Sequence, residues 1–331
     1  MRKLATSLLT VGLLISGRGL WSQQTPTQPT TTQQKAGHAA SGAPQSQLPQ
    51  TTVTVDVKLV NVFVTVTDEN GAPVGGLAKD NFVLDEDGIE QKIAVFDRES
   101  AMPLSIALAI DTSLSTRTNL PLEQASAKRF ANDIVRPVDG LCVYGFSEVV
   151  NEATPGYTSD LKRIDEGIEH IRVGAATALY DAIYLASRAL DRRQGRKVIV
   201  LITDGGDTVS KVDYKEAERA AEEAEAIVYS VIIVPIENSA GRETGGEHAL
   251  IQLSEDTGGK YYYATSTAAL DDAFHKISDE LRTQYLLAYY PSQRTSFSEF
   301  RRIDVKIADV PQAAGYHVRH RAGYYTVKSD F

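Results

Sequence analysis

Cysteine is almost absent from this chain. Cys142 is the only one among 331 residues, so no disulfide can form within the chain. It lies in the apolar run from Leu141 to Phe146, where a cysteine behaves as a small buried hydrophobic side chain. No cysteine follows the apolar stretch at the N-terminus, so lipid attachment there has no acceptor. The sequence therefore predicts a fold that is stabilised by its core and not by covalent cross-links.

Familiar catalytic motifs are missing as well. The chain contains no G-x-S-x-G, no H-E-x-x-H and no P-loop sequence, and its six histidines are scattered. Basic residues are outnumbered, with 34 Lys and Arg against 43 Asp and Glu, which gives a formal net charge of −9. We therefore expect a protein that is not an enzyme, and an acidic chain of this kind is not expected to bind nucleic acid.

The N-terminus has the pattern of a targeting segment. Met1 to Lys3 is basic, Leu4 to Ile15 is mostly apolar, and small residues follow as far as Ser22. The apolar stretch is too short to span a bilayer comfortably. We expect residues 1–22 to be a signal peptide and the mature chain to be secreted or periplasmic, without a membrane span. An uncleaved anchor remains an alternative.

Composition divides the rest of the chain into four segments. Residues 23–52 are rich in Gln, Thr and Pro, which predicts a disordered linker. Residues 53–100 alternate apolar and polar side chains, as an N-terminal β segment does. Residues 101–283 read as strands separated by helices, which predicts an α/β domain. Alternation returns in residues 284–328, a C-terminal β segment that we expect to pair with residues 53–100.

These segments predict an α/β fold with a doubly wound, mostly parallel sheet and helices on both faces. Each flanking β segment has too few strands to be stable alone, so we expect the two to form one β-sandwich that flanks the α/β domain or has it inserted. In the first flank, Asp87-Gly88 predicts a hairpin turn between the strands Phe82 to Asp85 and Gln91 to Phe96.

Two of the expected parallel strands end in a carboxylate. One runs from Leu104 to Asp111, and the other from Lys197 to Thr203 is followed by an aspartate and two glycines. Hydroxyl side chains follow the first strand, and another hydroxyl lies in a loop between the two strands. Oxygen-only donors suit Mg²⁺ or Mn²⁺ and not Zn²⁺. Because ligands bind at the carboxyl ends of such strands, we predict an ion site at Asp111, Ser113 and Ser115, with Asp204 at the same edge of the sheet. Turn formation and helix capping, for example by Thr177, remain the ordinary alternative.

These residues follow a known order: D-x-S-x-S from Asp111 to Ser115, a later Thr177, and a T-D-G turn around Asp204. In this order they resemble the metal-ion-dependent adhesion site of the von Willebrand factor type A family. The resemblance implies that Ser113, Ser115 and Thr177 bind the ion directly, while Asp111 and Asp204 act mainly through bound water. The first β segment contains Val-Thr-Asp-x-x-Gly from Val66 to Gly71 and Phe-x-x-x-Glu-Asp-Gly from Phe82 to Gly88. With these stretches before the site, the domain order resembles that of a group of bacterial secreted proteins.

The resemblance implies an adhesion-type function, in which the ion captures an Asp or Glu side chain of a partner protein. Two alternatives remain. The chain could be a metal-independent scaffold or assembly protein of the cell envelope, with the sandwich making the contacts. It could also be a Mg²⁺-dependent phosphohydrolase, but such an enzyme usually places a second carboxylate where this chain has Ser113.

Overall fold

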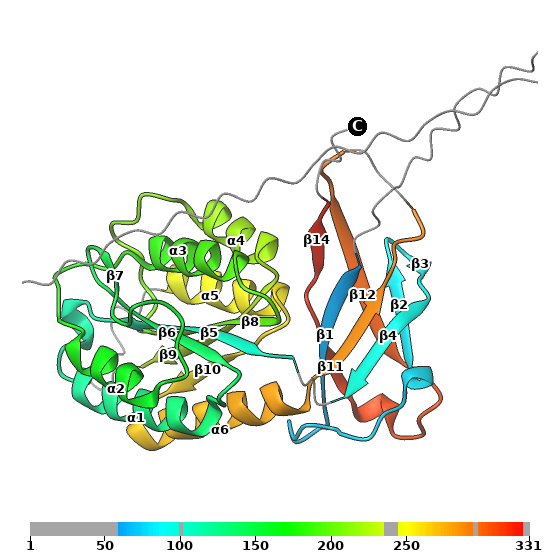
Figure 1. The fold of residues 1–331 in the computed structure, drawn as a ribbon, viewed down its shortest axis with the longest axis horizontal. Coiled ribbons are helices and arrows are strands. Elements are labelled where there is room, and N and C mark those ends of the chain that lie inside the picture. The colour runs from blue at the N-terminus through cyan, green and yellow to red at the C-terminus, as the bar shows by residue number, and fades with distance from the viewer. Residues whose placement is uncertain (1–58, 99–101, 235–243, 294–296, 327–331) are drawn as a thin grey trace, which may run out of the picture. The chain divides into compact units, whose positions relative to one another are not determined.

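The computed structural model describes residues 59–98, 102–234, 244–293 and 297–326 (Figure 1). The expected signal peptide (1–22) and linker (23–52) lie outside the described residues, so they and the expected export stay predictions. Over the described part of the chain, no helix is both long and apolar enough to cross a membrane.

A six-stranded sheet forms the centre of the α/β region, with the strand order β10-β9-β8-β5-β6-β7. All neighbouring strands are parallel except the short β7 at one edge, which confirms the expected mostly parallel sheet. The strands are β5 (Leu104–Asp111), β6 (Gly140–Phe146), β7 (Val150–Glu152), β8 (Arg196–Thr203), β9 (Ala226–Ile233) and β10 (Tyr261–Ala264).

Helices cover both faces of this sheet, as expected for a doubly wound fold. In Figure 1, α1, α2 and α6 lie below the sheet and α3, α4 and α5 above it. Residues of β5 supply both cores: Ile106, Leu108 and Ile110 pack with the first set of helices, and the small Ala107 and Ala109 with the second. The helices are α1 (Leu120–Ile134), α2 (Leu161–His170), α3 (Leu179–Asp191), α4 (Tyr214–Glu223), α5 (Thr244–Asp256) and α6 (Thr267–Thr283).

The strand order has a switch point between β5 and β8. From β5 the chain continues to β6 on one side, whereas β8 and β9 lie on the other side. Ligands of open α/β sheets bind outside the carboxyl ends of the strands at such a point. Asp111 and Thr203 are the last residues of these two strands, so the topology places the candidate site at this edge.

Two four-stranded antiparallel sheets form the expected sandwich from both ends of the described chain. One has the order β13-β1-β11-β4 and the other β14-β12-β2-β3. Alternate residues face the shared core, among them Val62 and Val64 of β1 and Leu287 of β11. The strands are β1 (Val60–Thr67), β2 (Phe82–Glu86), β3 (Ile89–Glu90), β4 (Ile93–Arg98), β11 (Tyr285–Tyr289), β12 (Phe300–Ile307), β13 (His317–Arg319) and β14 (Gly323–Tyr325). Short 3-10 helices cover Lys79–Asn81, Leu114–Thr116 and Ala313–Gly315.

One strand pairing differs from the prediction. The turn at Asp87 and Gly88 is present, with φ of 49° and 79°, but it joins β2 to the two-residue β3. The following strand, β4, pairs with β11 in the other sheet. The sequence identified the turn because turn chemistry is local, but it could not show that the chain changes sheets two residues later.

The connections to the sandwich lie at the amino edge of the central sheet. β4 precedes the start of β5, and α6 is followed by β11. Arg196, the first residue of β8, donates through Nη1 to the carbonyl of Leu281 near the end of α6. The carboxyl edge, with the candidate site, is therefore the opposite edge. The domain boundaries at 100 and 283 stay predictions.

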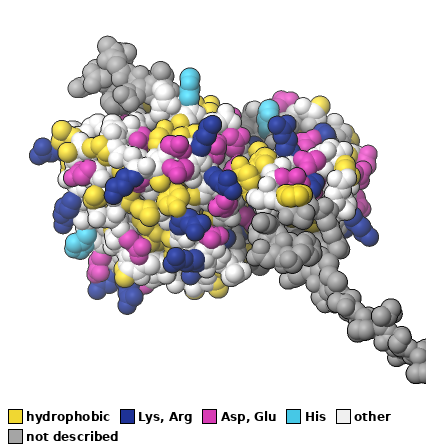
Figure 2. All heavy atoms as spheres, turned by 90° about the horizontal axis from the view of Figure 1, so that it is seen from above, with side chains coloured by type: hydrophobic (Ala, Val, Ile, Leu, Met, Phe, Trp, Pro, Cys, Tyr) yellow, Lys and Arg dark blue, Asp and Glu magenta, His cyan; other side chains and the backbone are white. Residues whose placement is uncertain are grey.

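Charged side chains of both signs are spread over the face drawn in Figure 2, with hydrophobic side chains between them. Nucleic-acid-binding surfaces typically carry a block of positive charge instead. The absence of a nucleic-acid partner remains an expectation from the sequence.

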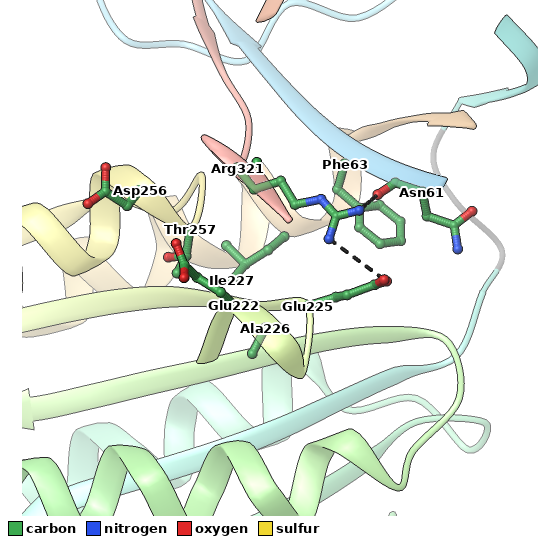
Figure 3. Close-up of a pocket in the computed structure, with 10 residues that line it drawn as sticks. Asn61, Phe63, Glu222, Glu225, Ala226, Ile227, Asp256, Thr257 and Arg321 are labelled. Atoms are coloured by element: carbon green, nitrogen blue, oxygen red, sulfur yellow. Dashed lines mark hydrogen bonds and ion pairs between the residues drawn. The ribbon is translucent and has the colours of Figure 1, made fainter. Parts of the chain in front are cut away.

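A small cavity of about 20 Å³ adjoins the junction of α4 and β9 (Figure 3). Arg321 reaches into it, where Nη2 donates to the Asn61 carbonyl over 2.6 Å and Nη1 lies 3.7 Å from Glu225 Oε1. Glu222 also lines the cavity. A space of this size has room for about one water molecule, so it does not constitute a ligand site.

Glu222→Gln should remove part of the pH dependence of stability. Burial, with smaller contributions from Glu218 and Asp256, raises the pKa of Glu222 to about 7 from an ordinary 4.5. The folded protein therefore binds this proton more tightly than the unfolded chain does. The resulting stabilisation is present at low pH and is lost as the pH rises from about 4.5 to about 7. Because glutamine cannot ionise, the stability of the variant relative to wild type should increase between pH 5 and 8. Urea unfolding at four pH values measures this; a difference that does not change with pH would contradict it.

Candidate metal centre

Asp111 lies at the carboxyl end of β5 and is fully buried. Its Oδ1 accepts a hydrogen bond from the Ser113 amide over 2.8 Å, and Oδ2 accepts one from the Thr203 hydroxyl over 2.7 Å. Burial raises the pKa of Asp111 to about 6; these hydrogen bonds oppose the shift and the nearby Asp204 adds to it. The charge of Asp204, which follows β8, thus acts on the carboxyl group of Asp111 at the end of β5.

The loop after β5 brings two hydroxyls together. Ser113 Oγ lies 3.0 Å from Ser115 Oγ. The Thr116 hydroxyl donates to the carbonyls of Asp111 and Ser113, over 3.1 and 3.0 Å, which fixes the loop against the end of the strand. Ser113 is buried and Ser115 is exposed, so the pair extends from the interior to the surface.

Asp204 directly follows β8 and is half-buried. The chain then turns at Gly205, whose φ of +106° strongly favours glycine. The Gly205 amide donates to the Thr203 hydroxyl over 3.1 Å. That hydroxyl therefore links the turn of Asp204 to the carboxylate of Asp111.

Thr177 lies in the loop between α2 and α3 and is buried. It does not cap α3, because the N-cap residue is Ala178. Its amide donates to the Thr208 hydroxyl over 2.9 Å, and its carbonyl accepts from the Thr208 amide over 2.8 Å, which ties it to the loop after β8. The same segment is tied to the loop after β5, because the Gly174 amide donates to the Thr112 carbonyl over 2.8 Å. Thr177 is thus held between the two other parts of the candidate site.

The predicted site did not include Thr203, Thr208 or Asp207. Thr203 holds the Asp111 carboxylate, and Thr208 positions Thr177. Asp207 accepts hydrogen bonds from the Tyr180 amide and from Ser210, so it supports the start of α3. The position of Thr203 directly before Asp204 could have marked it in the sequence as a residue of the site. No feature of the sequence marks Thr208 in this way.

The donor set at this edge consists of oxygen atoms. Among the described residues, no group of three or more His, Cys, Asp and Glu side chains is placed to hold a metal ion, at this edge or elsewhere. The candidate site has two carboxylates and adds hydroxyls to them. Oxygen donors of this kind fit Mg²⁺ or Mn²⁺ better than Zn²⁺.

Exposed apolar side chains lie on the loops that form this edge. Leu114 and Val149 are 58% and 55% exposed, and they follow β5 and β6; Val209 follows β8 and is 44% exposed. Val173, in the loop of Thr177, is 38% exposed. Four loops thus each present an aliphatic side chain beside the polar residues of the candidate site.

A comparison with known protein families finds a match in part of the α/β region. Residues 106–206 match the family model described as "von Willebrand factor type A domain". A search of the curated proteins found no match.

Three solved bacterial structures are similar to the chain at low identity. A von Willebrand factor type A protein from Catenulispora acidiphila is 12% identical, with a TM-score of 0.48, over 80% of this chain and 73% of that one. The PilB minor pilin from Streptococcus sanguinis is 14% identical, with a TM-score of 0.44, over 55% of this chain and 62% of that one. The vWF domain of the type V pili tip protein Mfa5 from Porphyromonas gingivalis is 12% identical, with a TM-score of 0.44, over 60% of this chain and 100% of that one.

The match therefore spans less than two thirds of the pilin. At such identities and TM-scores, none of the three structures bears on the partner or activity of this chain. The matched segment contains β5, β8 and all five candidate residues. Residues 106–206 of this chain belong to a von Willebrand factor type A domain.

Proposed function

We propose that this chain is an exported binding protein whose von Willebrand factor type A domain captures an acidic side chain of a partner protein through Mg²⁺ or Mn²⁺. The observation that carries the proposal is the convergence of Asp111, Ser113, Ser115 and Asp204 at the switch point of the sheet. Export rests on the N-terminal sequence pattern.

The spacing of the two serine hydroxyls supports binding of a small octahedral ion. Neighbouring oxygens in an octahedral Mg²⁺ shell, each about 2.1 Å from the ion, lie about 3.0 Å apart. Ser113 Oγ and Ser115 Oγ are 3.0 Å apart. They could therefore bind one ion side by side, with Asp111 and Asp204 balancing its charge.

Neutral hydroxyls would leave the ion most of its positive charge. An incoming carboxylate would then be attracted more strongly to this ion than to one whose ligands are all anionic. The exposed aliphatic side chains on the surrounding loops favour a protein as the partner, because apolar surface beside a polar site is typical of protein interfaces. The ion would supply the charge that holds the carboxylate, and Leu114 and its neighbours would contact the residues beside it.

A selection with displayed peptides tests the proposal directly. A random peptide library is selected on the full chain in the presence of Mn²⁺. We expect the enriched peptides to contain Asp or Glu, and to lose binding when that residue becomes Asn or Gln, when a chelator is added, or when the protein carries Ser113→Ala. As a matched control, Leu114→Ala should weaken peptide binding without changing Mn²⁺ affinity, because neither leucine nor alanine has a donor atom in its side chain.

Two other results would favour the alternatives. Peptide binding that survives both the chelator and Ser113→Ala would reject metal capture and support a metal-independent scaffold. Turnover of 4-nitrophenyl phosphate that disappears in Asp111→Asn would support a phosphohydrolase.

A further inference from the structure

Glu123 is a buried carboxylate without a partner in the described part of the chain. It lies in the first turn of α1, and only 2% of the residue is exposed. Both side-chain oxygens, Oε1 and Oε2, lack a hydrogen bond from any described residue. An unpaired polar group in the interior costs free energy, so such a group in a native fold points to a missing water or ion.

Other buried glutamates of this protein are compensated. Glu86 accepts hydrogen bonds from the hydroxyls of Tyr289 and Tyr324, over 2.6 and 2.9 Å. Glu280 accepts a hydrogen bond from the Tyr262 hydroxyl over 3.1 Å and forms an ion pair with Arg319, whose Nη2 lies 2.6 Å from Oε2. The fold therefore provides partners for buried carboxylates elsewhere, and Glu123 stands apart from this pattern.

Chain order places Glu123 near the candidate metal centre, because α1 begins at Leu120, shortly after Ser113 and Ser115 in the loop that follows β5. Burial is the main cause that raises its pKa to about 8, and the negative charges of Asp111 and Asp204 raise it further. No basic group lowers this pKa. The carboxylates that follow or end β5 and β8 thus act on Glu123, and no Lys or Arg is among the groups that act on it. A divalent cation bound at the candidate centre would supply the missing positive charge.

We propose that Glu123 is an additional residue of the metal centre, where its carboxylate accepts hydrogen bonds from water bound to the ion. The inference rests on the proposed function, since it assumes that an ion binds between Asp111 and Asp204. Carboxylates that orient bound water in this way hold the remaining shell in place, and their loss typically weakens metal binding about 10- to 100-fold. Neither turn chemistry nor helix capping requires this glutamate to be buried.

Glu123→Gln in the full chain tests the role, because glutamine has the same shape and no charge. Isothermal titration with Mn²⁺ should show an affinity about 10- to 100-fold lower than in wild type. Without metal, at pH 8, the unfolding midpoint of the variant should equal or exceed that of wild type, because a neutral amide replaces a carboxylate beside two others. A purely structural role would change the midpoint and leave the affinity unchanged.

Two further variants separate the possible outcomes. Asp133→Asn removes an exposed charge from the last turn of the same helix and should leave Mn²⁺ affinity unchanged. Glu123→Asp keeps the charge on a shorter side chain and should bind Mn²⁺ more tightly than Glu123→Gln. If wild type binds Mn²⁺ and Glu123→Gln binds it equally well, this inference is wrong and the proposed function stands. If wild type binds no Mn²⁺, the proposed function itself fails.

Discussion

Asp111→Asn should abolish the stabilisation of this protein by Mn²⁺ or Mg²⁺. An ion at 100 times its dissociation constant stabilises the native state by about 2.7 kcal/mol, which corresponds to a rise in the unfolding midpoint of roughly 5 °C or more. Asparagine retains an acceptor for the Ser113 amide or the Thr203 hydroxyl, so the fold should persist. It lacks the charge that balances the ion. Thermal unfolding with chelator and then with millimolar ion measures the difference.

Asp207→Asn is the matched control for this experiment. Asp207 lies on the same loop as Asp204, but its carboxylate accepts from Tyr180 and Ser210 at the start of α3. Its replacement should lower the midpoint without metal and leave the rise caused by the ion intact. An equal rise in wild type and in Asp111→Asn would place the ion elsewhere on the protein and overturn the proposed site.

Gly246→Ala should damage both the stability of the fold and the candidate metal centre. A Cβ at this position would lie 1.5 Å from the carbonyl oxygen of Gly205, in the turn that follows Asp204. No rotation of a side chain can relieve this contact, because the obstructing atom belongs to the backbone. The start of α5 or the turn of Asp204 must move, at a cost of about 1–3 kcal/mol or more. Mn²⁺ affinity should fall roughly tenfold or more, since a site loosened by about 1 Å loses its preorganisation.

Gly245→Ala is the corresponding control on the same turn of α5. A Cβ there would meet no described atom within 4 Å. Alanine also favours a helix more than glycine does, so stability should stay unchanged or rise slightly. Urea unfolding and Mn²⁺ titration of the two variants give the comparison. If Gly246→Ala behaved like Gly245→Ala, the close approach of α5 to the turn would have no role in holding the site.

The sequence by itself determined the classes of the main elements. The buried run that ends at Asp111 is β5, and the strands and helices expected between residues 101 and 283 are present. Strand and helix periods involve residues a few positions apart, so they can be recognised without the fold. The alternation at both ends of the chain likewise predicted strands, and the pairing of β1 with β11 confirms the expected sandwich. The order of the site motifs also predicted the family that the matched segment belongs to.

Tertiary structure decided the features that depend on contacts between distant segments. Thr203 binds Asp111 across 92 positions of the chain, and β4 leaves its expected partner for β11. Glu123 shows most clearly what the sequence alone cannot predict. An acid in the first turn of a helix is ordinary, because it faces the positive end of the helix dipole and is usually exposed. Only the packing of α1 shows that this glutamate is buried, unpartnered and close to two other carboxylates, since burial depends on which face of the helix meets the core.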